Sequence, residues 1–287
     1  MQRPYVIAEI GANHCGDFEL ARRMVRIAAD FCGVDFVKFQ KRDIGNIPNG
    51  EVVCPDPAQA YGRTIREHRQ ALEFTFEQHE ELKKLAHSLK IGYGCSVFDQ
   101  PSLEGMIALA PDYIKFGSAV NERVDLLEYA FDNWPRDIHI SLGMMTLDVR
   151  RLLMSFLWEH GKGRDAKVVL YHCVTAYPVR PKHAALQEIA VLSSAKQPGI
   201  FDEVGYSGHH QGVALDLVAF TLGAQWIERH FTLDRTWKGT DHIASLEPDG
   251  LRKVVKYLND AAEAITLKPE GGIVECEIES RRKYKGG

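Results

Sequence analysis

Short apolar runs alternate with longer amphipathic stretches along almost the whole chain. Apolar runs of about four to eight residues are typical of buried strands, whereas apolar residues repeated every three to four positions are typical of helices. Eight runs are predicted to be strands, at residues 5–11, 36–40, 91–98, 113–118, 138–143, 168–174, 203–209 and 226–232. Helical patterns lie between them, including residues 18–31, 76–89, 146–160 and 212–222. Thr75 followed by Gln78 predicts a capping box at the start of the second of these helices.

This alternation predicts an α/β fold, a (β/α)8 TIM barrel over residues 1–268, with a charged tail and a short helix over residues 269–287. A doubly wound sheet is less consistent with the sequence, because no Gly-x-Gly-x-x-Gly motif follows the first strand. Residues 41–73 form a long insertion after the second strand, rich in Pro, Gly and Arg. Long loops at the carboxyl face of a barrel are usually functional.

Composition excludes several classes of function. The net charge of −4 gives the chain no basic character, so nucleic-acid binding is not expected, and an anionic substrate needs a local cluster of Lys and Arg. No apolar run is long enough for a membrane span, so no membrane role is expected. The six cysteines form no Cys-x-x-Cys pair, and the N-terminus leads directly into a strand without room for a signal peptide. Free thiols and a cytoplasmic location are therefore expected.

Polar residues occur near the carboxyl ends of strands that should be apolar, because both faces of a barrel strand are covered. The strand period of two places Lys38 with Gln40 on one face, and likewise Glu228 with His230. Active sites of TIM barrels lie at this end of the strands, so these side chains predict a site in the barrel mouth. The set comprises Glu9, Lys38, Gln40, Ser96, Lys115, Ser118, Ser141, His172, Ser207, His209, Glu228 and His230.

Two imidazoles in this set predict a metal site. His209 and His230 lie near the ends of neighbouring predicted strands, where both can reach one divalent ion. Glu228 or Asp241 can add an oxygen ligand or orient a histidine. Imidazole, carboxylate and open positions suit Mn, Fe, Co or Zn alike.

Two buried lysines predict an anion site. Lys38 and Lys115 lie on the second and fourth strands, and burying an unpaired lysine is costly. Glu9 is expected either to contact the substrate or to pair with a barrel lysine such as Lys38. Two further groups are relevant: hydroxyl donors at Ser118, Ser141 and Ser207, and insertion arginines at Arg42, Arg63 and Arg66. Cys95 and Cys173 lie in apolar runs without basic neighbours, which favours inert core thiols.

An ordered set of motifs resembles the sialic acid synthase family, whose members make nonulosonic acids such as N-acetylneuraminate from phosphoenolpyruvate (PEP) and an N-acetylated hexose. Each motif is weak alone, but they follow the family order across nearly the whole barrel. The motifs are AEIGANH at 8–14, VKFQ at 37–40, YIKFGS at 113–118, SLGM at 141–144, HCVTAYP at 172–178, GYSGH at 205–209, IERHFTLD at 227–234 and GTDH at 239–242.

The resemblance implies a role for each matching residue. His209 and His230 would hold the metal, with Mn2+ expected first and Co2+, Fe2+, Mg2+ or Zn2+ as alternatives. Residues implied to contact PEP are Lys38, Gln40, Lys115, Ser118, Ser141, Thr175 and Ser207. Ser96 is expected to bind substrate from its place near a strand end. Residues implied to face the sugar aldehyde or support the metal are Glu9, Tyr177, Glu228 and Asp241. A homodimer is also expected, because the barrel mouth in this family is completed by a partner subunit.

The chain departs from the family pattern in ways that indicate a short branch lacking the C-terminal antifreeze-like domain. The sequence ends where that domain would begin, and Val120 stands where the family usually has an acidic residue. The family's Ser-Asp-His is Ser207-Gly208-His209 here, and Val174-Thr175 follows Cys173. The resemblance therefore implies the condensation chemistry but not the identity of the sugar.

Two alternatives stay open. A sibling enzyme would condense PEP with a sugar phosphate, as in octulosonate or heptulosonate synthesis, and Arg42, Arg63 and Arg66 could hold the second phosphate. A non-catalytic barrel would instead act as a binding subunit, completed by a separate antifreeze-like domain protein. The retention of both strand histidines and both strand lysines argues against the second alternative.

Overall fold

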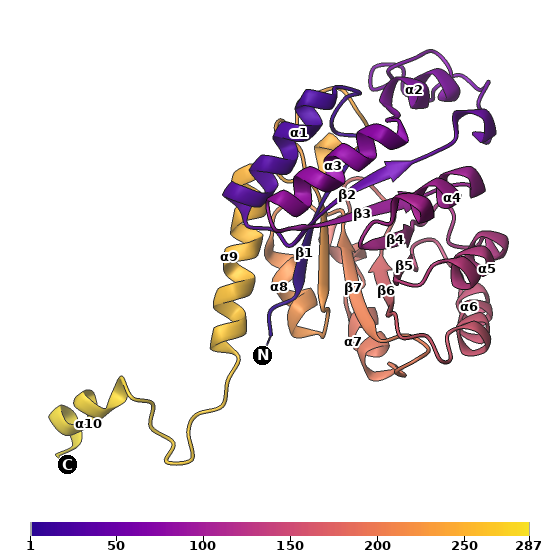
Figure 1. The fold of residues 1–287 in the computed structure, drawn as a ribbon. Coiled ribbons are helices and arrows are strands. Elements are labelled where there is room, and N and C mark those ends of the chain that lie inside the picture. The colour runs from indigo at the N-terminus through magenta and orange to yellow at the C-terminus, as the bar shows by residue number, and fades with distance from the viewer. Residues whose placement is uncertain (1, 287) are drawn as a thin grey trace.

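The computed structural model describes residues 2–286, and eight parallel strands within them close into a barrel (Figure 1). Each strand pairs with the next along the chain, and β1 pairs with β8 to close the sheet. The predicted (β/α)8 architecture is therefore confirmed. The strands are β1 Tyr5–Gly11, β2 Phe36–Lys41, β3 Gly92–Val97, β4 Tyr113–Phe116, β5 Asp137–Ser141, β6 Val168–Cys173, β7 Glu203–Gly208 and β8 Trp226–His230.

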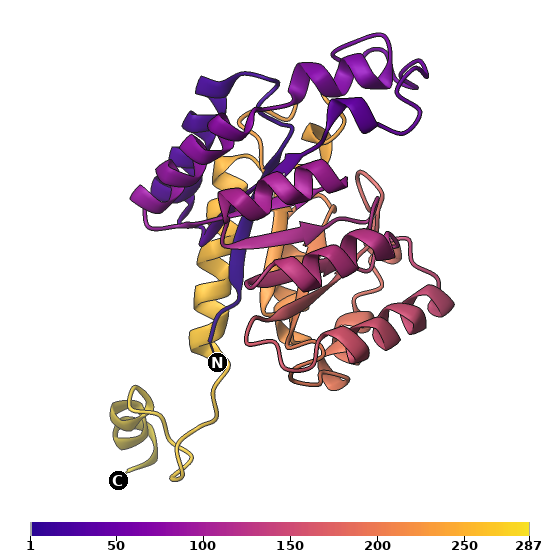
Figure 2. The same ribbon diagram turned by 45° about the vertical axis from the view of Figure 1, so that its right-hand side comes forward.

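Helices surround the barrel in the two views of Figures 1 and 2. The capping box predicted at Thr75 and Gln78 is present at the start of α3, where each side chain bonds the other residue's backbone N–H. The helices are α1 Phe18–Arg26, α2 Ile65–Leu72, α3 Phe76–Ser88, α4 Gln100–Leu109, α5 Val124–Asn133, α6 Leu147–His160, α7 Gln187–Ser194, α8 Ala214–Thr221, α9 Pro248–Ala264 and α10 Glu277–Lys285.

Several predicted strands are longer than the strands in the structure. Residues 113–118 were predicted as one strand, but β4 ends at Phe116, and residues 226–232 end as a strand at His230. After Phe116, Gly117 and Ser118 line the cavity, whereas after His230, Phe231 and Thr232 stay buried outside it. The helical pattern at 18–31 is correct in position, but its second half is a π-helical turn over Ile27–Cys32.

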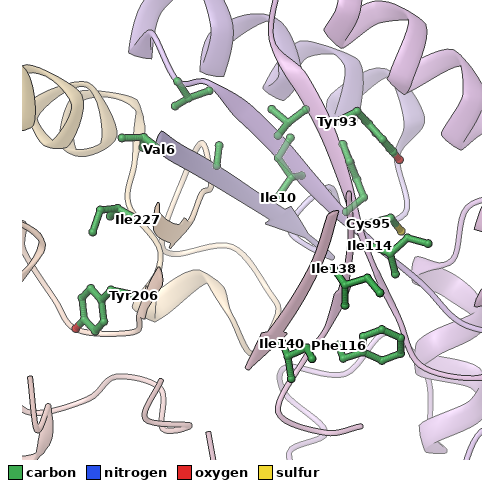
Figure 3. Packing of buried hydrophobic residues seen from close by; sticks show 14 of the residues in the cluster. Val6, Ile10, Tyr93, Cys95, Ile114, Phe116, Ile138, Ile140, Tyr206 and Ile227 are labelled. Carbon is green, nitrogen blue, oxygen red and sulfur yellow. The ribbon is translucent and has the colours of Figure 1, made fainter. Parts of the chain in front are cut away.

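Two apolar layers fix the strand ends in space. Between strands and helices lies a continuous core, part of which is shown in Figure 3, with Val6, Phe116 and Ile140 among its labelled residues. Inside the barrel, a second group closes the amino-terminal end and comprises Ile7, Tyr113, Val169, Tyr171 and Trp226. Because this floor is filled, the cavity lies at the opposite, carboxyl end. The floor also holds a buried polar strand residue, His139, whose ring stacks on Tyr113 with centroids 3.9 Å apart.

The insertion over residues 41–73 is folded against the loop after β8. The Gln59 side-chain oxygen accepts a hydrogen bond from the Gly239 N–H at 2.8 Å, and the Tyr61 hydroxyl donates to the Lys238 carbonyl at 2.6 Å. Within the insertion, Thr64 caps α2 through a second capping box. These contacts hold α2 at one side of the barrel mouth, so the insertion contributes to its wall.

The tail contains the predicted short helix, α10, which lies apart from the barrel in both Figure 1 and Figure 2. Among residues 2–286, no helix combines the length and apolar character needed to cross a membrane.

Candidate active site at the carboxyl end of the barrel

One cavity of about 760 Å³ opens at the carboxyl end of the strands. The structure places on its wall the residues that were expected to be catalytic, substrate-binding or metal-binding. These residues are Glu9, Lys38, Gln40, Ser96, Lys115, Ser118, Ser141, Thr175, Tyr177, Ser207, His209, Glu228, His230 and Asp241. His172, which was also expected in the mouth, is instead buried with its Nε2 at 2.7 Å from the Ala184 carbonyl. Strand register predicted the members that lie on the strands, because a period of two places alternate side chains inside the barrel. Thr175 and Tyr177 were implied by the family resemblance, and Asp241 was a candidate because it follows the last strand.

Lys38 is the centre of a buried network on β1–β3. Its ammonium nitrogen lies 2.6 Å from Glu9 Oε2 and donates to Ser96 Oγ at 2.8 Å. Gln40 Nε2 donates to the other Glu9 oxygen at 2.8 Å. Burial disfavours the Lys38 charge, but the carboxylates of Glu228 and Glu9 raise the Lys38 pKa above its ordinary value. The salt bridge expected between Glu9 and Lys38 is therefore present.

The Glu228 carboxylate contacts side chains from three other strands. Lys115 Nζ lies 2.7 Å from Glu228 Oε2, and Ser207 Oγ donates to Oε1 at 3.1 Å. Lys38 Nζ lies 3.8 Å from the same Oε1. Burial alone would raise the Glu228 pKa, but the two lysines hold it well below its usual range. Glu228 is thus an ionised carboxylate between two ammonium groups.

Hydroxyl groups gather on the β4–β6 side of the cavity. Ser118 Oγ and Ser141 Oγ are 2.8 Å apart, and Cys173 Sγ lies 3.8 Å from Thr175 Oγ1. A Cβ built on Gly143 would lie 2.4 Å from Ser118 Oγ and 2.6 Å from Thr175 Oγ1. Only glycine at this position leaves the space between the two hydroxyls open, so the backbone and hydroxyls form a small cradle for a polar group.

The two histidines face each other on the β7–β8 side. Their ring centroids are 5.3 Å apart. His209 Nδ1 bonds the Val174 carbonyl at 2.9 Å, which fixes the proton on Nδ1 and leaves the Nε2 lone pair free. His230 Nδ1 lies 3.9 Å from Asp241 Oδ2 and makes no hydrogen bond within residues 2–286. Burial lowers the His230 pKa to about 4, although Asp241 opposes this shift, so the ring is neutral at pH 7.

Tyr177 covers this pair. Its ring centroid lies 4.3 Å from that of His209 and 5.7 Å from that of His230, and its side chain reaches the cavity. Within residues 2–286, no group of three or more His, Cys, Asp or Glu side chains is arranged to hold a metal, and this holds for His209, His230 and Asp241 as well.

Sequence reasoning missed part of the cavity wall. Arg69 on α2 faces the cavity together with Arg42, whereas Arg63 and Arg66 do not. Arg66 instead bonds Glu51 and the Ile44 carbonyl within the insertion. No sequence signal marked Arg69, because its position depends on how the insertion folds.

The interpretation of Cys173 as an inert core thiol was wrong. Its sulfur lines the cavity and lies 4.0 Å from His209 Nδ1. Burial opposes the thiolate, but the contact with His209 lowers the Cys173 pKa to about 7. Cys95 does face the core, and burial raises its pKa. Val120, the departure from the family pattern, is also buried in the core and does not line the cavity.

Comparison with known proteins identifies the family. The NeuB family profile matches residues 24–269. The chain belongs to the NeuB family. It is 37% identical over 307 residues to N-acetylneuraminate-9-phosphate synthase of Drosophila melanogaster, covering 97% of this chain and 79% of the fly protein. It is 34% identical over 283 residues to the Mus musculus enzyme of the same name, covering 97% of this chain and 76% of that protein.

A solved NeuB-type structure agrees with this assignment. The N-acetylneuraminic acid (sialic acid) synthetase of Leptospira borgpetersenii superposes with a TM-score of 0.81 at 27% identity, covering 100% of this chain and 94% of the other. These homologues of the chain are thus named as sialic-acid-type synthases. The chain is an enzyme of this type, a carbon–carbon bond-forming transferase that condenses PEP with a sugar.

Proposed function

We propose that the cavity joins PEP to the open-chain aldehyde of a hexose, giving a 3-deoxy-2-ulosonic acid and inorganic phosphate. One observation carries this proposal: buried lysines and hydroxyls on one side of a single cavity face two imidazoles on the other. The first group suits the phosphate and carboxylate of PEP, and the second suits a site that polarises an aldehyde oxygen.

PEP would bind on the lysine and hydroxyl side. The cradle formed by Ser118, Ser141 and Thr175 has the size and donors for a phosphate oxygen, and Lys115 lies at the end of the adjoining strand β4. The Lys38 side, with Gln40, Ser96 and Ser207, would then hold the carboxylate. Both lysines are already paired with carboxylates in the cavity, so PEP binding requires Glu9 and Glu228 to share them.

A divalent metal would bind His209 and His230. The residues fit such an ion, because both rings face the cavity, His209 keeps a free Nε2 lone pair, and the buried His230 Nδ1 has no hydrogen bond within residues 2–286. Two imidazoles leave further positions open for substrate or water, as catalytic sites require. When bound, the ion would act as a Lewis acid toward the aldehyde oxygen. Mn2+ is the first expectation, with Co2+, Fe2+, Mg2+ and Zn2+ as alternatives.

The side chains would align the two substrates and move protons. With PEP fixed by the lysines and hydroxyls, its C3 attacks the aldehyde carbon and forms the new C–C bond. Water adds to the resulting electron-poor C2, and phosphate leaves by C–O cleavage. Glu9 would accept the proton from that water, a role supported by its raised pKa, which results from burial, and by the contacts of its carboxylate with Lys38 and Gln40. Asp241 would orient the acceptor beside His230.

The acceptor would be an N-acetylated hexose. Three carbons of the product come from PEP, so C6 of the hexose becomes C9 of the product. The fly and mouse relatives are named for a 9-phosphate product, whereas the Leptospira protein is named for the unphosphorylated acid. Both forms share the aldehyde chemistry proposed here.

The test is release of inorganic phosphate from PEP in the presence of Mn2+, over a panel of aldoses with and without N-acetyl and phosphate groups. Release that depends on the aldehyde and is abolished by EDTA is expected. Phosphate release without any aldose, or none with every aldose by metal-loaded protein, would overturn the proposal.

We also propose an assembly state and a cell compartment for this protein. We expect a cytoplasmic homodimer, supported by the family resemblance and by the six cysteines, which are all free thiols. A separate antifreeze-like domain protein is a further expected partner. Residues 1–268 would form the catalytic domain, since α10 in the tail lies apart from the barrel (Figure 2). Size-exclusion chromatography with light scattering measures the assembly directly.

A further inference from the structure

Arg42 and Arg69 have no part in the chemistry proposed above, although both line the cavity. Arg42 directly follows β2, and its guanidinium lies 3.4 Å above the centre of the Phe98 ring. Arg69 projects from α2 in the insertion. Within residues 2–286, neither side chain forms a hydrogen bond or a salt bridge.

The other buried or half-buried cations around the mouth each have an acceptor within the chain. Lys38 and Lys115 are paired with Glu9 and Glu228, and Lys41 lies 2.7 Å from Glu73. Even Arg235, a third arginine on the wall, donates to a backbone carbonyl. Arg42 and Arg69 are therefore the guanidinium groups on the described cavity wall that the chain itself leaves without an acceptor.

The neighbouring positive charges of Arg42 and Arg69 are electrostatically unfavourable unless an anion binds between them. Burial and the neighbouring charge of Arg69 lower the Arg42 pKa to about 9, and Glu73 and Asp241 offset only part of the effect. Two like charges that face one cavity are stabilised by an anion between them, and planar guanidinium groups match phosphate oxygens well.

The position of the pair distinguishes it from the PEP site. Arg42 and Arg69 come from the end of β2 and from α2, whereas the hydroxyl cradle lies on the β4–β6 side. Asp241, beside His230, interacts electrostatically with both arginines, so they lie on the side of the cavity where the acceptor would bind. The bonds from Gln59 to Gly239 and from Tyr61 to Lys238 hold α2 in this position.

We propose that Arg42 and Arg69 form an anion subsite for a phosphate group at the end of the acceptor sugar distant from its aldehyde. The inference rests on the proposed condensation and specifies its substrate class as a phosphorylated aldose. The proposal keeps Arg42 from the insertion arginines that the sequence offered for a second phosphate, and it names Arg69 as the partner in place of Arg63 or Arg66.

The test compares kcat/KM for N-acetylmannosamine 6-phosphate and for N-acetylmannosamine, with PEP saturating and Mn2+ present. The wild-type chain should prefer the phosphorylated acceptor. In Arg42→Gln and Arg69→Gln, the ratio of the two kcat/KM values should fall by about 10- to 100-fold each, the usual effect of losing one charge-assisted contact. Arg63→Gln is the matched control, because Arg63 is exposed in the same insertion and does not line the cavity. It should keep the wild-type ratio.

Binding by calorimetry gives a second readout that does not need turnover or a fully active variant. Wild-type protein should bind N-acetylmannosamine 6-phosphate more tightly than N-acetylmannosamine. Equal affinities, or a rise in the KM of PEP without a change in acceptor ratio, would overturn the phosphate subsite. The condensation proposal would survive that result, because it fails only if no acceptor supports phosphate release.

Discussion

Lys115 and Glu228 meet across the interior of the barrel, with Nζ 2.7 Å from Oε2, although their strands β4 and β8 lie on opposite sides of the closed sheet. Both side chains are buried, and the same carboxylate also accepts from Ser207. The pair therefore connects the proposed PEP side of the cavity to the strand that carries His230.

Replacement of Glu228 by Gln should destabilise the fold. The amide keeps the shape of the carboxylate but leaves Lys115 buried without its counter-charge, and removing one partner of a buried pair typically costs about 3–5 kcal/mol. Urea unfolding at pH 7 measures the loss. Glu80→Gln is the control, since Glu80 pairs with Lys84 on the surface of α3 and its loss should leave the midpoint unchanged. Equal midpoints for both variants would show that Lys115 finds another partner.

Gly143→Ala should block PEP binding without unfolding the barrel. The new methyl group would lie 2.4 Å from Ser118 Oγ and 2.6 Å from Thr175 Oγ1, which fills the hydroxyl cradle. The KM for PEP should rise by at least about tenfold, equivalent to about 1.4 kcal/mol of lost binding. Gly271→Ala in the tail is the control, because its Cβ would meet no atom within 4 Å. An unchanged KM in Gly143→Ala would place the phosphate elsewhere.

Metal binding should depend on both cavity histidines. His209→Ala and His230→Ala each remove one of two imidazoles, so bound Mn2+ after dialysis should fall and turnover should drop by about 100-fold or more. Metal content by mass spectrometry and phosphate release from PEP are the measurements. His183→Ala removes an exposed histidine outside the cavity and should retain both properties. Full metal content and turnover in His209→Ala would contradict the metal assignment.

Acid should destabilise the protein through His79, which is buried between α3 and the barrel. Its Nδ1 contacts the Tyr93 hydroxyl at 2.6 Å, and burial, with the charge of Lys41, lowers its pKa from about 6.5 to about 3. Between these values the unfolded chain binds a proton that the folded chain does not, so stability falls as the pH falls. The contribution of His79 is up to about 1.4 kcal/mol per pH unit. Urea unfolding between pH 7 and pH 5 should therefore show a shallower decline in His79→Gln, and identical slopes would refute this role.

Local sequence patterns were sufficient for the barrel and for most of the cavity wall. The alternation of strand and helix patterns is a local property, and the period of two along each strand decides which side chains enter the barrel. The pairing of Glu9 with Lys38 was also predictable, because the two residues are direct neighbours in the β1–β2 register. Strand ends were less accurate, since loop residues near the mouth continue the same pattern of polar and apolar positions.

Tertiary structure decided the contacts between parts of the chain that no local pattern relates. The ion pair between Lys115 and Glu228 depends on closure of the sheet, because closure brings side chains of opposite strands close together. The cavity position of Arg69 depends on docking of the insertion against the loop after β8. Cys173 gains its basic neighbour only when β7 lies beside β6. The sequence therefore determined which strand residues enter the mouth. The fold decided which of them meet and which insertion residues join them, because both depend on distances between parts of the chain that are far apart in sequence.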